Sequence, residues 1–130
     1  MNLLSYRTGA RRNIFAEWYN SQSFKVKADC DSVLKFLRQR SRLDWKRPHY
    51  DTLRKDCDGL GEIRFKSDRA QHRLVGYMGP VPEKYTVLVP AKERDGQFVP
   101  PSTCRTALDR MKDVQSSETF YCKIDEGLDE

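Results

Sequence analysis

The residues best suited to chemistry lie in two short stretches where charged side chains alternate with apolar ones. In the first stretch, Arg64 and Lys66 alternate with Ile63 and Phe65, which is the period-two pattern of a strand with one buried face. Such a strand presents a row of positive charges either to solvent or to an anionic substrate. The pattern alone leaves both interpretations open.

A second predicted strand, Gln71 to Met78, adds charged groups that suit an anionic substrate. His72 and Arg73 stand at its start, and Lys92 follows the third predicted strand. Glu62 fits better as the partner of a neighbouring cation than as a general base.

The composition predicts a single domain with a small core and a heavily charged surface. The chain has 130 residues, of which 38% are hydrophobic and 33% are charged, and its mean hydropathy is −0.80. It contains no run of about eighteen apolar residues, so we expect no transmembrane helix. The apolar start, Met1 to Ser5, is too short for a signal peptide. These observations favour a cytoplasmic protein with no membrane partner.

The cysteines and histidines predict neither a metal site nor a cofactor. The four cysteines are scattered without a CxxC pair, and neither His49 nor His72 lies near a cysteine in the sequence. Structural zinc sites usually bring paired ligands at short spacing. We therefore expect four reduced cysteines, as is usual in the cytosol.

The charge is unevenly distributed along the chain. The formal net charge is +5, yet the last six residues hold four acidic residues and no Lys or Arg. Residues 1–124 therefore form a body of about +9, which suggests a polyanionic or acidic partner. The acidic segment 125–130 is interpreted as a disordered solubilising tail. A sharper hypothesis is that the negative charges of this segment screen the basic body from an anionic partner.

Periodicity and turn residues predict one α+β domain over residues 1–124. Its expected form is a helical hairpin packed on a small antiparallel sheet of three to four strands, with a C-terminal helix. Trp45 to Cys57 is expected to be loop with a turn of helix around Tyr50 to Arg54. The expected elements are a strand at Asn2 to Arg7, a short helix capped by Asn13, a helix from Phe24 to Arg42, strands at 62–66, 71–78 and 84–91, a turn at 66–69, a loop at 92–99, a helix at Ser102 to Val114, and a short strand or docked tail at Phe120 to Lys123.

The longer predicted helix carries one apolar stripe and many cations. Lys35 and Arg38 lie among the cations on its other sides, a solvated face that also suits contact with RNA phosphate. The expected stripe is Phe24, Ala28, Val33, Leu34 and Leu37.

The order of these segments resembles the RelE/HigB-type toxins of bacterial toxin–antitoxin systems, in particular their phage-derived HigB-like branch. The resemblance covers residues 13–114 and implies a compact RelE-like α+β fold. It is carried by Phe15, Glu17 and Trp18 in the first helix, by Gly59-Leu60 followed by Glu62 to Phe65, by Gln71 to Val75 with Tyr77, and by Lys92, Pro101, Ala107 and Arg110.

The resemblance also implies roles for individual residues. Arg73 matches the arginine that such toxins place against the scissile phosphate, Arg64 matches a basic strand position, and Lys92 matches the basic position after the third strand. Many members carry a Tyr or His near the C-terminus, but the last predicted helix has neither. His72 is therefore added to the catalytic set, with Tyr77 and Tyr121 as other substitutes. The residues expected to bind RNA are Lys66, Arg69, Arg94, Lys35 and Arg38.

Such toxins are most often ribosome-dependent mRNA endonucleases. The resemblance thus implies the toxin of a type II toxin–antitoxin system, a metal-independent endoribonuclease that inhibits translation. Its partners would be the ribosome, mRNA and an antitoxin of the helix-turn-helix type, with DNA contacted only through the antitoxin complex. Two alternatives stay open: a protein of this fold that binds DNA gyrase without catalysis, as the related ParE proteins are thought to do, and a phage RNA- or protein-binding module.

Overall fold

The computed structural model describes residues 1–128. This part of the chain forms seven strands, three α-helices and short 3-10 turns. The elements are β1 (Asn2–Tyr6), α1 (Ile14–Asn20), α2 (Phe24–Arg38), β2 (Tyr50–Thr52), the 3-10 turn η2 (Lys55–Cys57), β3 (Gly61–Ser67), β4 (Ala70–Met78), β5 (Lys84–Arg94), β6 (Gln97–Val99), α3 (Thr103–Ser116) and β7 (Tyr121–Lys123).

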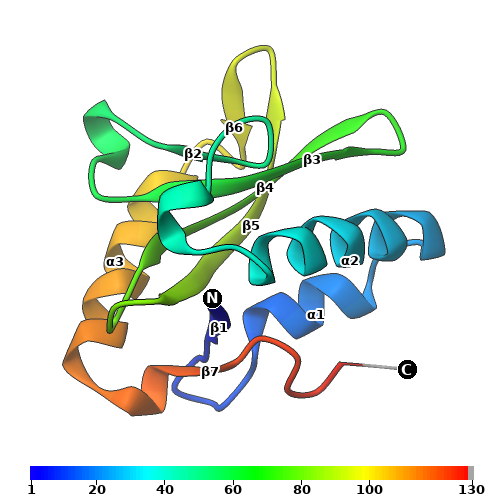
Figure 1. Cartoon of the computed structure of the whole chain (residues 1–130). Helices are drawn as coiled ribbons and strands as arrows, with labels where there is room; N and C mark the ends of the chain where they lie inside the picture. Colours follow the sequence, from blue (N-terminus) through cyan, green and yellow to red (C-terminus); the bar gives the residue numbers. More distant parts are fainter. Residues whose placement is uncertain (129–130) are drawn as a thin grey trace.

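All seven strands join one mixed sheet. Its order is β2-β3-β4-β5-β1-β7, and β6 pairs with the far end of β5. β1 runs parallel to β5, whereas the other pairs are antiparallel. In Figure 1, α1 and α2 lie together on one side of the sheet and α3 lies on the other. The molecule is therefore an α+β protein with helices on both faces of the sheet.

The prediction of a small antiparallel sheet of three to four strands is wrong, because the sheet has seven strands and is mixed. The three longest strands, β3, β4 and β5, were expected, and so was β1. The additional strands β2 and β6 have three residues each, which is too short for a period-two signal. β2 occupies part of the expected loop, and β6 returns from β5 through Asp95 and Gly96, whose φ angles of 54° and 78° suit a tight hairpin.

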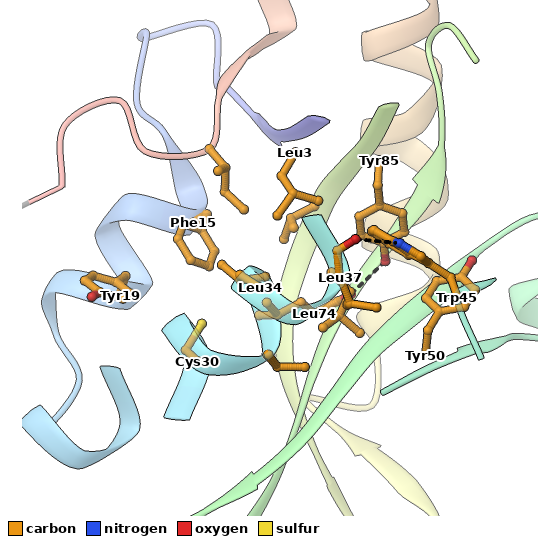
Figure 2. Packing of buried hydrophobic residues seen from close by; sticks show 14 residues of the cluster. Leu3, Phe15, Tyr19, Cys30, Leu34, Leu37, Trp45, Tyr50, Leu74 and Tyr85 are labelled. Carbon is orange, nitrogen blue, oxygen red and sulfur yellow. Dashed lines mark hydrogen bonds between the residues drawn. The ribbon is translucent and has the colours of Figure 1, made fainter. Parts of the chain in front are cut away.

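The core on the side of α1 and α2 is rich in aromatic residues. Figure 2 shows Leu37 beside Trp45, whose indole Nε1 donates to the Leu37 carbonyl at 3.0 Å. The Tyr85 hydroxyl donates to the Leu74 carbonyl at 2.8 Å. Both polar tips are thus satisfied inside an apolar layer, which removes the cost of burying them.

The helical hairpin begins as expected but differs in its details. The Asn13 side chain accepts from the amides of Phe15 and Ala16, so its prediction as the cap of α1 is confirmed. α2 ends at Arg38 rather than Arg42. Phe24 is 87% exposed, so it does not belong to the apolar stripe. The buried stripe is Val26, Cys30, Val33, Leu34 and Leu37.

The expectation of four reduced cysteines is wrong. Cys57 of η2 and Cys104 of α3 form a disulfide, with Cα atoms 5.2 Å apart and a sequence separation of 47. Two cysteines this far apart form no local motif, so the sequence alone does not predict that they are bonded to each other. Cys30 and Cys122 are free and buried.

The start of the acidic segment is held by hydrogen bonds, in place of the disordered tail expected. Asn13 Nδ2 donates to the Glu126 carbonyl at 2.8 Å, and Arg7 lies 3.7 Å from the Glu126 carboxylate. Asp129 and Glu130, the end of that segment, lie outside the described residues.

None of the helices within residues 1–128 is long and apolar enough to cross a membrane.

Candidate functional site

A groove of about 490 Å³ runs between α2, the loop at Pro48 and His49, and the outer edge of β3. It exists because β2 pairs only with Gly61 to Ile63, so no strand within residues 1–128 covers the outer edge of β3 beyond that point. The last backbone contact along this edge is the bond from the Arg64 amide to the His49 carbonyl, at 2.8 Å. The groove is therefore open along the half of β3 that carries its cations.

Arg64, Lys66 and Arg73 line this groove together. Lys66 is exposed and Arg64 is half-buried. Arg64 stands directly opposite Arg73 in the β3–β4 pair, an arrangement of like charges that is unfavourable without a counter-ion. Glu62 supplies that counter-ion: its carboxylate accepts from Arg64 at 2.5 Å and lies 3.7 Å from Arg73 Nε.

Arg73 is held deep in the sheet rather than presented on its surface. Its side chain is 3% exposed. One terminal nitrogen donates to Glu93 at 3.0 Å and the other to the His72 carbonyl at 2.9 Å. Its Nε makes no hydrogen bond within residues 1–128. The guanidinium thus has two carboxylates beside it, and its buried Nε lies 3.7 Å from one of them, that of Glu62.

Glu62 is a buried carboxylate whose charge is matched by cations. Burial raises its pKa, and the neighbouring Arg64 and Arg73 charges partly oppose that rise. These contacts confirm the interpretation of Glu62 as the partner of neighbouring cations.

His72 lies on the opposite face of the sheet from Arg73, as successive strand residues must. It is 1% exposed, stacked on Phe65 at 4.9 Å between ring centroids, with Trp18 at 5.9 Å. Burial lowers its pKa, helped by the charges of Lys92 and Arg73. In this position the imidazole has no route to a substrate in the groove.

The other predicted residues lie outside the groove lining. Lys92 stands opposite His72 across β4 and β5, so it shares the face of His72 rather than that of Arg73. Arg69, at the β3–β4 turn, and Arg94, near the end of β5, are exposed at hairpin ends. Neither Tyr77 nor Tyr121, the suggested substitutes, lines the groove.

Lys35 and Arg38 belong to a separate hollow. They line it with Asp125, so part of the acidic segment lies beside two of the predicted RNA-binding cations. Of the nine predicted site residues, the structure brings Arg64, Lys66 and Arg73 into one groove and distributes the rest over other surfaces.

Sequence reasoning missed two aromatic residues of the groove, Phe36 and His49. His49 follows Pro48 in a stretch without periodicity, next to the unrecognised strand β2, so no sequence signal placed it beside Arg64. Phe36 had a signal, since Arg40 follows it four residues later within the helix that was predicted to run to Arg42. The Arg40 guanidinium lies 3.4 Å from the Phe36 ring centroid.

No family model, no curated protein and no solved structure matches the chain.

Proposed function

We propose that the protein is the toxin of a type II toxin–antitoxin system that binds messenger RNA on the ribosome and cleaves it. The observation that carries this proposal is the groove along β3, where Arg64, Lys66 and Arg73 meet beside aromatic side chains. Clustered cations beside aromatic rings are the usual means of holding single-stranded RNA. The basic body supports the same partner.

In the proposed reaction the cations act on the scissile phosphate. The 2′-oxygen loses its proton to a base and bonds to phosphorus, the bond from phosphorus to the 5′-oxygen breaks, and that oxygen gains a proton. Arg64 and Lys66 would offset the charge that builds on the phosphate. Arg73, whose side chain is buried, would act by keeping Arg64 and Glu62 in place. Because the ribosome would hold the mRNA in position, the toxin itself would need to supply only a few charged groups.

The partners in this proposal are the ribosome, mRNA and an antitoxin of the helix-turn-helix type. DNA would be contacted only through the antitoxin complex. The protein would work in the cytoplasm without a metal or cofactor.

The test is to induce the protein and map transcript ends on translating ribosomes. Wild-type protein should cut in codon register, and the double variant Arg64→Ala/Lys66→Ala should lose this cleavage by at least about tenfold, because each charge-assisted phosphate contact contributes on the order of 1 kcal/mol or more. The matched control is Lys35→Ala/Arg38→Ala, which removes the same charge outside the groove and should retain cleavage. Equal loss in both variants would contradict the groove as the site.

A non-catalytic RNA- or protein-binding module is the second candidate. It is favoured by the burial of His72 and by the carboxylates that already engage Arg73. Intact transcripts and unaffected growth would support it, whereas intact transcripts with broken DNA would point to gyrase binding.

A further inference from the structure

A stack of three side chains forms one wall of the groove. Phe36 packs against the His49 ring, with centroids 4.0 Å apart and planes 30° from parallel. The Arg40 guanidinium lies against Phe36 and donates to the Phe36 carbonyl at 2.8 Å. Phe36, a residue of α2, therefore has two planar groups packed on it: Arg40 from just beyond the end of the helix and His49 from the loop before β2.

The backbone also fixes the position of His49. Its amide donates to the Lys46 carbonyl at 3.1 Å, and its carbonyl accepts from the Arg64 amide at 2.8 Å. The second contact sets the imidazole directly beside the strand that carries the groove cations. Neither ring nitrogen of His49 hydrogen-bonds to any of residues 1–128. The half-buried ring is thus held by stacking and by its backbone while it borders the groove.

The cation of this groove that is most available to an anion is Lys66. The lining holds Arg64, Lys66 and Arg73 with one carboxylate, that of Asp29, which already accepts two hydrogen bonds. Glu62 and Glu93 pair with Arg64 and Arg73, whereas Lys66 is exposed and makes no ion pair within residues 1–128. A ligand that combines a flat ring with a negative backbone matches this lining.

We propose that the His49 ring, backed by Phe36, is a stacking platform for one base of a single-stranded RNA whose phosphates lie along Arg64 and Lys66. The platform rests on the proposed function in one respect, namely that RNA enters this groove. A stacked base needs no sequence-specific hydrogen bonds, so the platform accepts any of the four bases. The groove volume of about 490 Å³ is within the range of small-ligand sites and suits one nucleotide better than a folded partner.

The test measures binding of a fluorescent single-stranded RNA of about ten nucleotides, within the usual site size of such proteins. His49→Ala should weaken binding about five- to hundredfold, the range for loss of one stacked base. His49→Phe keeps a flat ring and should bind within about twofold of wild type. The matched control is Phe24→Ala, which removes an exposed aromatic ring of α2 outside the groove and should leave binding unchanged.

Salt dependence separates stacking from charge. Arg64→Ala should reduce the slope of log affinity against log salt by about 0.7, the value for one phosphate contact on a single strand, whereas His49→Ala should leave the slope unchanged. If wild-type protein binds RNA and His49→Ala binds equally well, the platform is refuted while RNA binding stands. If His49→Phe loses binding as His49→Ala does, stacking is refuted. If wild-type protein does not bind RNA, the proposed function and the platform both fall.

Discussion

Breaking the disulfide between Cys57 and Cys104 is expected to lower the free energy of unfolding by about 4 kcal/mol. The bond closes a loop over a separation of 47 residues. The chain-entropy relation for a cross-link of that span gives about 4 kcal/mol near room temperature. This is a large share of the roughly 5–15 kcal/mol by which single domains are usually stable.

The contacts around the bond explain why native strain should not cancel this effect. η2 and the start of α3 pack together, and the half-buried Cys57 lies against the same core as Cys104. The bond therefore joins segments that already touch in the fold, and its main effect is to restrict the unfolded chain.

Urea unfolding followed by circular dichroism measures the effect. With a slope of about 2 kcal/mol per molar urea, dithiothreitol should lower the midpoint by about 2 M. The double variant Cys57→Ala/Cys104→Ala should unfold near the reduced midpoint and should not respond to dithiothreitol, which controls for the buried Cys30 and Cys122. A shift of less than about 1 kcal/mol on reduction, with the slope unchanged, would refute the cross-link as a major source of stability.

Two further predictions concern charge. Burial lowers the pKa of His72, so near pH 6.5 the imidazole binds a proton in the unfolded chain but stays neutral in the folded protein. The free energy of unfolding should therefore fall as the pH drops below about 6.5, by at most about 1.4 kcal/mol per pH unit. It should level off below the folded-state pKa. His72→Phe should flatten this part of a stability profile measured from pH 8 to pH 5, and an unchanged slope would contradict the explanation. Neutralising the acidic segment with Asp125→Asn/Glu126→Gln should strengthen RNA binding at low salt, because it removes two negative charges that repel RNA as it approaches the basic body. Equal gains at low and high salt would rule out screening as the cause.

Much of the fold could be predicted from local signals. Asn13 was found because a capping residue precedes apolar residues at helical spacing, and β4 was found from its length and composition. β2 could not be found, since three residues carry no period and the pairing that makes them a strand depends on β3. Phe24 was misplaced because an aromatic residue at a helix start was assumed to be buried, whereas it points to solvent.

The candidate site was predictable only in part, and one error could have been avoided. Successive residues of a strand point to opposite faces of the sheet, so this alternation already argued against placing His72 and Arg73 in one catalytic set. The same register places Lys92 with His72. The burial of Arg73 between carboxylates could not be predicted, since it depends on Glu93 of another strand. His49 depends likewise on a long-range backbone contact.

The placement of β1 has a consequence for how the protein is made. β1 precedes both of its neighbours in the chain, residues 84–87 of β5 and 121–123 of β7. During synthesis β1 therefore stays unpaired until β5 and then β7 emerge, and contacts of such high sequence separation slow folding. A chain truncated shortly before residue 121 would keep every groove residue but leave one edge of β1 open, a form prone to pair with other chains. Completion of the sheet is in this way coupled to the synthesis of β7.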